Sequence, residues 1–273
     1  MTTSPADSFG LAGQICVVTG SAGGIGRGIA LALAAEGAKV AILDRNEAGA
    51  RETLALVRQA GGEGMAAGCD VADQASVEAA HAAVKQGLGE AHVLVNNAAL
   101  IRPGALKDIS LADWNALLAV NLTGYFICAQ IFGRPMLERG SGSLVHTSSV
   151  AATVATPYSG SYSVAKAGVS MFSRLLALEW GPLGVRSNAV LPGLISTPMT
   201  KAVYERPGMT ERRAAIIPSR RVGYPDDIAK AVVFLASTKC AEYVNGAELV
   251  VDGAFSHSLM SHIPAAGVRV KAD

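Results

Sequence analysis

The sequence predicts one α/β domain, a doubly wound parallel sheet of seven strands with helices on both faces. Three observations predict this fold. Short β-branched runs alternate with helical stretches of roughly ten residues or more, half of the 273 residues are hydrophobic, and only 16% are charged. Such alternation is typical of right-handed βαβ crossovers, and so little charge suits a sheet that is buried on both faces. We therefore expect a single domain over residues 1–273.

Short apolar runs predict the strands, and turn or cap residues bound each of them. In chain order the strands are expected at Ile15–Thr19, Lys39–Leu43, Met65–Asp70, His92–Val95, Ser143–Ser149, Val185–Val190 and Glu248–Asp252. The third of these is the weakest. The carboxyl ends of parallel strands meet at one edge of the sheet, and ligands bind there, close to the point at which the strand order reverses.

Capping residues predict the helices between these strands. The first three are expected at Gly24–Glu36, Asn46–Ala60 and Asp73–Leu88. A longer helix starts at Ser110 and runs toward Phe132, with Pro135 marking its end or a kink. Another carries Tyr162 and continues to Trp180. Both long helices are apolar on more than one stripe, so we expect the sheet and a second subunit to cover them, as in a homodimer or homotetramer.

Composition and charge exclude several classes of function. The formal net charge of +1 gives no broad attraction to nucleic acid or to an anionic membrane, so neither partner is expected. The four cysteines are widely spaced and the five histidines form no ligand cluster, which predicts reduced thiols and no metal site. Met1–Phe9 lacks the basic and apolar regions of a signal peptide, and no apolar run approaches the roughly 18 residues of a membrane span. These features predict a cytoplasmic protein.

A glycine-rich stretch, Thr19–Gly26, lies directly between the first strand and the first helix. Its glycines allow a tight turn and the close approach of a pyrophosphate, and the helix N-terminus offers free N-H groups. The spacing Gly-x-x-x-Gly-x-Gly differs from the Gly-x-Gly-x-x-Gly fingerprint, so its place at the first βα junction is the stronger argument. We expect a dinucleotide site there, formed by Gly20, Ser21, Gly24, Ile25 and Gly26.

An acidic residue at the end of the second strand, Asp44, favours NAD as the cofactor. Its carboxylate can accept hydrogen bonds from a ribose 2′-OH and would repel the 2′-phosphate of NADP. Arg45 follows it and could offset part of that repulsion. The alternative for Asp44 is a turn or cap residue, which we consider the weaker interpretation after this glycine loop.

Two further strand ends add to the predicted cofactor site. Asp70 and Val71 follow the third strand and are expected near the adenine. Asn97 follows the fourth strand and is expected to border the adenine ribose. The alternative for Asn96 and Asn97 is that their amides tie neighbouring loops together, and we favour that alternative for Asn96.

The chemistry is predicted at Tyr162 and Lys166, one turn apart on the same face of a helix. A free tyrosine titrates at about pH 10, but a neighbouring cation favours the phenolate and lowers its pKa. Such a pair also arises by chance, so its meaning depends on a cofactor and a second hydrogen-bond donor nearby. Ser149, at the end of the fifth strand, would project a hydroxyl into the same crevice. The three residues together predict a site for proton transfer beside the cofactor.

Three more motifs follow the same order along the chain, Asn121, Pro192-Gly193 and Asp252-Gly253. With them the chain, over roughly Leu11 to Gly253, resembles the single-domain, NAD-dependent form of the short-chain dehydrogenase/reductase family. The resemblance implies a Rossmann-type fold and hydride transfer between nicotinamide and a carbonyl or secondary alcohol. Ala99 and Ala254 stand where the family usually has glycine, which puts only the local backbone geometry in doubt.

The same resemblance implies a role for each catalytic residue. Tyr162 would be the general acid/base, and Ser149 would hydrogen-bond the reacting oxygen. Lys166 would lower the tyrosine pKa and bind the nicotinamide ribose. Asn121 would position a water for proton exchange with Lys166.

After the sixth strand, the loop that starts at Pro192-Gly193 would bind the nicotinamide carboxamide through Ile195 and Thr197. Residues 196–221 would form a variable substrate flap, in which apolar and basic side chains are mixed. We expect a moderately apolar pocket for an uncharged ketone or secondary alcohol. The extension at 255–273 either packs over a neighbouring subunit's site or frays.

Several functions remain open at this point. The first is an NAD-dependent alcohol dehydrogenase or ketone reductase, with a sugar or polyol dehydrogenase and a 3-oxoacyl reductase as alternatives. A 3-oxoacyl reductase usually prefers NADP, against which Asp44 argues. The non-enzymatic alternative is an NAD-binding regulatory protein on the same fold. A regulator has no need for the complete set of Asn121, Ser149, Tyr162 and Lys166, so the enzyme is favoured.

Overall fold

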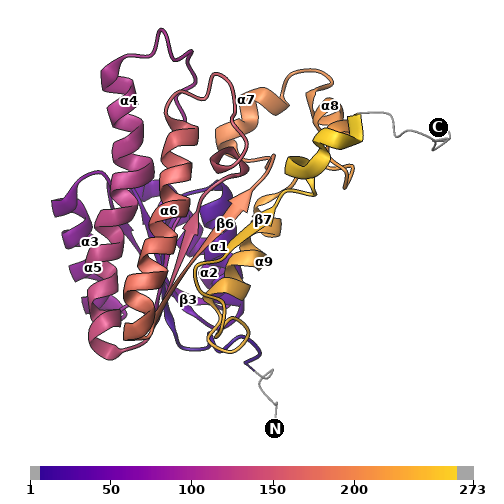
Figure 1. Ribbon diagram of the computed structural model, residues 1–273. Helices are drawn as coiled ribbons and strands as arrows, with labels where there is room; N and C mark the ends of the chain where they lie inside the picture. Colours follow the sequence, from indigo (N-terminus) through magenta and orange to yellow (C-terminus); the bar gives the residue numbers. More distant parts are fainter. Residues whose placement is uncertain (1–6, 263–273) are drawn as a thin grey trace.

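A computed structural model describes residues 7–262, which form a parallel sheet of seven strands covered by helices on both faces (Figure 1). The strand order is β3-β2-β1-β4-β5-β6-β7. The bounds are β1 Ile15–Thr19, β2 Lys39–Asp44, β3 Glu63–Gly68, β4 Val93–Asn96, β5 Gly142–Thr147, β6 Val185–Pro192 and β7 Glu248–Val251. The predicted doubly wound fold is confirmed, and the order reverses between β1 and β4.

The side chains of each strand alternate between two apolar layers, as the pleat of a β-strand requires. In β1, Cys16 and Val18 face one layer while Ile15 and Val17 face the other. The first layer contains α1 (Gly24–Ala35), α2 (Glu47–Gln59) and α9 (Pro225–Ala236). The second contains α3 (Gln74–Gly87), α5 (Gly124–Arg139) and α6 (Tyr162–Trp180). This two-sided burial is the reason that the strands read as nearly continuous apolar runs.

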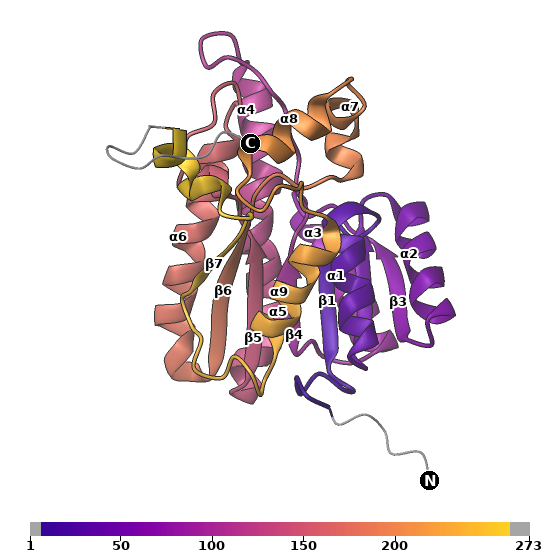
Figure 2. The ribbon, with the colours of Figure 1, turned by 90° about the vertical axis from the view of Figure 1, so that its right-hand side faces the viewer.

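The remaining elements lie at the ends of the sheet. They are α4 (Leu111–Leu118), a π-turn (Ala119–Thr123), α7 (Lys201–Tyr204), α8 (Met209–Ile216) and short 3₁₀ turns at Val150–Ala152, Gly181–Leu183, Pro198–Thr200 and Phe255–His262. Figure 2 shows α7 and α8 above the carboxyl edge of the sheet, where the predicted flap lies. Of the predicted C-terminal extension, only residues 255–262 fall within the described part of the chain.

Strand ends were predicted less accurately than strands. The third strand was expected to end at Asp70, but β3 ends at Gly68, which pairs with Asp44 at the last position of β2. Asp70 lies in the following turn instead, where its carboxylate accepts the N-H of Ala72 at 3.0 Å. The fifth strand was expected to reach Ser149 but ends at Thr147. In both cases the register with a neighbouring strand ends the ladder, and local sequence does not reveal that register.

Of the two alternatives predicted for Pro135, a helix end or a kink, the helix end was wrong. α4, the π-turn and α5 run as one helix from Leu111 to Arg139, and Pro135 lies inside it. Phe132 and Met136 on either side of the proline are fully buried. Their packing against the sheet compensates for the hydrogen bond that proline cannot make.

That helix is also the one stretch, among residues 7–262, that is long and apolar enough to cross a membrane by length and composition. No such run was expected from the sequence. Of its most apolar window, 44% is buried inside the protein. Its buried residues, among them Cys128 and Phe132, pack in the layer beneath the sheet, so we assign it as a core helix.

Ala254 has a left-handed backbone, with φ of 68°. This position follows Asp252-Gly253, where the sequence placed the local geometry in doubt. The conformation is retained because the Asp252 carboxylate accepts the N-H groups of Ala254 at 2.8 Å and of Ser256 at 2.7 Å. A left-handed alanine is strained, so the turn keeps its shape at the expense of stability.

Candidate active site

The glycine loop between β1 and α1 forms a cradle whose backbone packs too closely for side chains at Gly20 and Gly26. A Cβ on Gly20 would lie 2.5 Å from the Cα of Ala98, and one on Gly26 would lie 2.2 Å from the carbonyl oxygen of Gly20. Gly20 and Gly24 both have positive φ, of 66° and 55°. α1 starts at Gly24 without a side-chain cap, so the N-H groups of its first turn remain free for an anion. The cradle therefore fits a pyrophosphate.

Ser21 and Asn97 hold this loop in place from the inside. The Ser21 hydroxyl is buried and donates to the carbonyl of Val18 at 2.8 Å. The Asn97 amide donates to the carbonyls of Thr19 and Gly20, both at 3.0 Å. These polar groups brace the loop, so a cofactor would meet the two residues through their remaining atoms. The predicted contacts of Ser21 and Asn97 with the dinucleotide stay predictions.

Asp44 lies at the edge of the glycine loop, and the backbone holds its carboxylate in place. One oxygen accepts the N-H of Ala22 at 2.9 Å and the other accepts that of Asn46 at 2.8 Å. Arg45 points elsewhere, with its guanidinium 4.0 Å from the carboxylate of Asp70. The negative charge of Asp44 is thus held where β2 ends, beside the loop that would bind the pyrophosphate.

Val71 is buried below this edge of the sheet, 5% exposed, and touches the start of α5. Asn96 lies at the end of β4, where its amide donates to the carbonyl of Tyr125 at 3.0 Å and contacts His146 at 3.2 Å. This geometry agrees with the structural role that the sequence favoured for Asn96.

Tyr162 and Ser149 meet at the carboxyl edge of the sheet. Ser149 follows β5, and its hydroxyl accepts the N-H of Ala151 at 3.1 Å in a short 3₁₀ turn. Tyr162 is the first residue of α6, and its phenol lies near the Ser149 hydroxyl. The two residues therefore lie together at this edge, and their shared catalytic role stays a prediction.

Lys166 lies one turn further along α6 and is 1% exposed. Its Nζ donates to the carbonyl of Thr147 at 2.7 Å and to the hydroxyl of Tyr125 at 3.1 Å. Nζ also lies 5.7 Å from the centre of the Tyr162 ring. The lysine is therefore beneath the tyrosine, but its hydrogen bonds go to β5 and α5.

Burial controls the charges at this site. It raises the pKa of Tyr162, and the nearby Ser149 hydroxyl opposes that rise. It lowers the pKa of Lys166 to about 7. The sequence predicted a tyrosine pKa depressed by the lysine, and the structure corrects this: burial raises the pKa of Tyr162, and a lysine that titrates near neutrality is only partly charged.

Asn121 lies in the π-turn and is fully buried. Its side-chain oxygen accepts the N-H of Leu100 at 2.7 Å, and its amide donates to the carbonyl of the same residue at 2.8 Å. The side chain therefore joins the long helix to the segment after β4. The predicted role of Asn121 in positioning a water for Lys166 stays a prediction.

Tyr125 is the residue of this site that the sequence analysis missed. It lies one turn after Asn121 on the same helix, is 1% exposed, and donates its hydroxyl to the carbonyl of Thr147 at 3.0 Å. The signal was its spacing, because residues four apart on a helix share a face. A tyrosine below an asparagine on an apolar helix requires a polar partner.

The loop after β6 lies against the glycine loop. Pro192 is the last residue of β6. A Cβ on Gly193 would lie 2.5 Å from the Cβ of Asp252. Further on, Thr197 comes within 3.6 Å of the position of a Cβ on Gly24. The two parts of the predicted cofactor site, far apart in sequence, therefore meet at the N-terminus of α1.

Ile195 forms the base of the flap, 7% exposed, in a bridge with Gly223. The N-H of Ser196 donates to the carbonyl of Gly223 at 2.9 Å, which closes residues 196–221 into a loop. Within the flap, the guanidinium of Arg213 stacks on the ring of Tyr204 at 4.8 Å. The flap is thus built on a fixed base at the carboxyl edge of the sheet.

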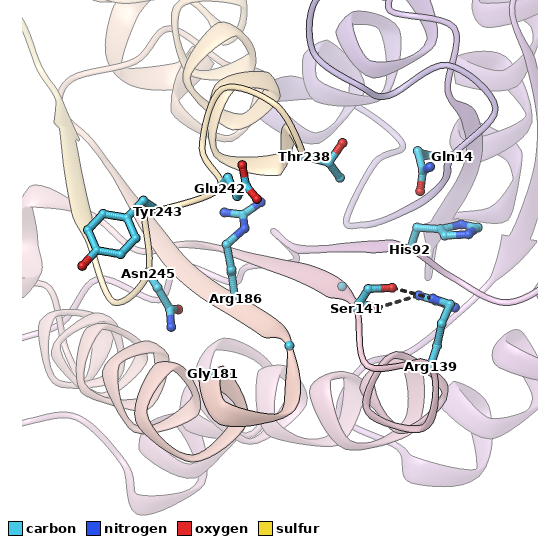
Figure 3. A pocket seen from close by; sticks show the side chains of 12 residues that line it. Gln14, His92, Arg139, Ser141, Gly181, Arg186, Thr238, Glu242, Tyr243 and Asn245 are labelled. Carbon is cyan, nitrogen blue, oxygen red and sulfur yellow. Dashed lines mark hydrogen bonds between the residues drawn. The ribbon is translucent and has the colours of Figure 1, made fainter.

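A cavity of about 730 Å³ lies at the opposite, amino edge of the sheet (Figure 3). Arg186, at its wall, donates to the carbonyls of Leu235, Val244 and Ser237. Arg139 donates to the carbonyl of Ala91 at 2.9 Å. The basic groups are therefore engaged by the protein itself, and we assign no chemistry to this cavity. Among residues 7–262, no group of His, Cys, Asp or Glu is placed to hold a metal ion.

Comparison with known proteins finds a matching family model and similar dehydrogenases. Residues 20–256 match a family model described as enoyl-(acyl carrier protein) reductase. The D-threitol dehydrogenase of Mycolicibacterium smegmatis is 43% identical over 253 residues, 91% of this chain and 95% of that protein. The galactitol 2-dehydrogenase (L-tagatose-forming) of Cereibacter sphaeroides is 38% identical over 254 residues, 91% of this chain and 97% of that protein.

Solved structures show the same fold. The crystal structure of a gluconate 5-dehydrogenase from Burkholderia cenocepacia J2315, in complex with NADP and tartrate, superimposes with a TM-score of 0.87. The two chains are 34% identical, and the match covers 92% of this chain and 98% of that one.

Proposed function

Because the chain belongs to the short-chain dehydrogenase/reductase family, we propose that it is an NAD-dependent oxidoreductase that interconverts a secondary alcohol and a ketone. The observation that carries this proposal is the grouping of Tyr162 and Ser149 above a buried Lys166, at the carboxyl edge of a parallel sheet. The glycine cradle at the same edge supports a dinucleotide beside that pair.

The proposed mechanism uses Tyr162 as the general acid/base. In alcohol oxidation its Oη takes the proton of the substrate hydroxyl while Ser149 holds the reacting oxygen, and in ketone reduction the proton returns. Nicotinamide, when bound, accepts or supplies the hydride. Because burial raises the pKa of Tyr162, the phenol is protonated at neutral pH and ready for reduction. Oxidation uses the phenolate of Tyr162, which the charged form of Lys166 favours.

The proposed cofactor is NAD. A carboxylate held by two backbone N-H groups at the end of β2 supports it, because Asp44 can bind a ribose diol and repels a phosphate. Arg45 leans toward Asp70 at 4.0 Å, which leaves the charge of Asp44 in place. The gluconate dehydrogenase structure contains NADP, so this proposal is specific to the residues of this chain.

We propose small uncharged secondary alcohols as substrates and place acyclic polyols first among them. The sequence ranked polyols below simple ketones and cyclic alcohols. We place them first because two relatives described above are a D-threitol dehydrogenase and a galactitol 2-dehydrogenase.

A homodimer or homotetramer is the proposed assembly, and the cytoplasm the proposed location. On α6, Met171, Leu175 and Leu178 are 52%, 48% and 75% exposed, and Phe126 on α5 is 45% exposed. Exposed apolar side chains on neighbouring helices are typical of a subunit interface. The cysteines at positions 16, 69, 128 and 240 are all free thiols, which fits a reducing compartment.

The test is a panel of secondary alcohols, C4 to C6 polyols included, assayed with NAD by the absorbance of NADH. The Tyr162→Phe variant should lose at least about 100-fold in kcat/KM, because proton transfer by a positioned side chain contributes that much. Retention of most activity by this variant would refute the mechanism. A wild-type protein that binds NADH but oxidises no alcohol, and reduces none of the matching ketones, would refute the function.

A further inference from the structure

We infer that Tyr125 is a positioning residue of the active site, whose hydroxyl holds the ammonium group of Lys166 beneath Tyr162. This inference rests on the proposed function. It starts from the contacts of Nζ, which donates to two oxygens, the carbonyl of Thr147 at 2.7 Å and the hydroxyl of Tyr125 at 3.1 Å. Among residues 7–262, no carboxylate forms an ion pair with this lysine. Two uncharged hydrogen-bond acceptors therefore determine the position of the Lys166 ammonium group.

Tyr125 is itself held on three sides. Its hydroxyl proton goes to the carbonyl of Thr147 at 3.0 Å, and its backbone carbonyl accepts the amide of Asn96 at 3.0 Å. Its ring stacks on that of His146, with the centroids 6.1 Å apart and an interplanar angle of 26°. Because the hydroxyl proton is engaged by Thr147, the lone pairs of the phenol oxygen face Lys166.

The hydroxyl and the ring of Tyr125 make separate contributions. Nζ lies 4.9 Å from the ring centroid, within the range of a cation–π contact, so a phenylalanine would keep that part. Only the hydroxyl supplies the hydrogen bond at 3.1 Å. A hydrogen bond to the charged form of a buried lysine favours that form. The hydroxyl therefore maintains the ammonium, and through it the phenolate of Tyr162.

The groups that face Lys166 come from three elements, Tyr162 on α6, Tyr125 on α5 and His146 on β5. Burial lowers the pKa of His146 to about 3, so this ring is neutral near pH 7. Burial raises the pKa of Tyr125 well above its ordinary value, and the pKa of Cys128 beside it likewise. Near pH 7, Lys166 is therefore the one charged side chain among these groups.

The test compares the full-length protein with Tyr125→Phe and with Ser187→Ala. Ser187 is a matched control, because its buried hydroxyl belongs to the same polar layer, 3.2 Å from His146 and 3.0 Å from Ser173, without touching Lys166. Protein labelled with ¹³C at lysine Cε is titrated by NMR, and the Lys166 signal is assigned by its loss in Lys166→Met. In Tyr125→Phe the pKa of Lys166 should fall by about half to one unit, and in Ser187→Ala it should not change.

The pH profile of kcat/KM for alcohol oxidation supplies the second measurement. In Tyr125→Phe its midpoint should move to higher pH, so that activity at pH 7 falls by about 3- to 10-fold and recovers as the pH rises. A purely structural role would lower activity equally at every pH.

An unchanged Lys166 titration in an active enzyme would overturn the inference and leave the proposed function standing. The same follows if Ser187→Ala shifts the titration as much as Tyr125→Phe. Absence of turnover in the wild type would instead refute the proposed function, whatever the NMR titration shows, so the two failures are distinguishable.

Discussion

The substitution Asp44→Ala tests how the chain selects its cofactor. The carboxylate of Asp44 accepts two backbone N-H groups, of Ala22 at 2.9 Å and of Asn46 at 2.8 Å, and is expected to accept a ribose hydroxyl as well. A hydrogen bond to a charged group contributes about 1.5–3 kcal/mol, so its loss should weaken NADH binding by about 10- to 100-fold. Removing the negative charge should at the same time strengthen the binding of NADPH.

The size of the second effect follows from the charge. Two like charges about 4 Å apart near a protein surface repel by about 1–4 kcal/mol, depending on the effective dielectric. Relief of even the lower value improves NADPH binding by about 5-fold. Together the two effects should lower the NAD:NADP ratio of kcat/KM by about 100-fold. Because Ala22 and Asn46 lose an acceptor, we also expect the free energy of unfolding to fall by about 1–3 kcal/mol.

Fluorescence titration with NADH and NADPH, together with the kcat/KM ratio, measures both effects. Asp44→Asn is the matched control, because it keeps an acceptor oxygen for the backbone and removes the charge. It should gain NADPH binding with a smaller loss of stability. A ratio that does not change in Asp44→Ala, with the fold intact by circular dichroism, would refute the role of this carboxylate in cofactor choice.

Three further predictions concern the loop, a turn and the core. Gly26→Ala should weaken NADH binding by at least about 10-fold, since its Cβ would lie 2.2 Å from the carbonyl of Gly20. Gly104→Ala is the control, because the nearest atom to its Cβ would be 3.9 Å away. Equal NADH binding by both variants would contradict the proposed pyrophosphate cradle. Ala254→Gly should raise Tm by about 1–4 °C, because φ of 68° costs an alanine about 1–2 kcal/mol, partly offset by the greater unfolded-state entropy of glycine. A lower Tm would show that the turn is not strained. Burial lowers the pKa of His146 to about 3, so the unfolded chain binds the proton first, and stability should be lost as the pH falls below about 6.5 toward 3. Chemical denaturation as a function of pH should show this slope weakened in His146→Gln; an unchanged slope would place the acid sensitivity elsewhere.

Local patterns were enough to predict the elements and the cofactor loop. The sequence shows the apolar runs of β1 and β2 and the glycines between β1 and α1 clearly. A buried parallel strand and a phosphate-binding turn each constrain the types of adjacent residues. Element ends were less predictable. β3 stops at Gly68 because β2, its partner, ends opposite at Asp44, and the helix continues past Pro135 because Phe132 and Met136 are buried. Both outcomes depend on neighbours that are distant in sequence.

By itself the sequence determined the fold class, and it predicted the first βα junction as the dinucleotide loop and Ser149, Tyr162 and Lys166 as the reactive group, because spacing along strands and helices carries that information. Only the tertiary structure decided the state of that group. Burial raises the pKa of Tyr162 and lowers that of Lys166, and it brings Tyr125, one turn after Asn121, within 3.1 Å of the lysine. Desolvation and hydrogen bonding between α5, β5 and α6 arise from packing in three dimensions, and no local pattern specifies them.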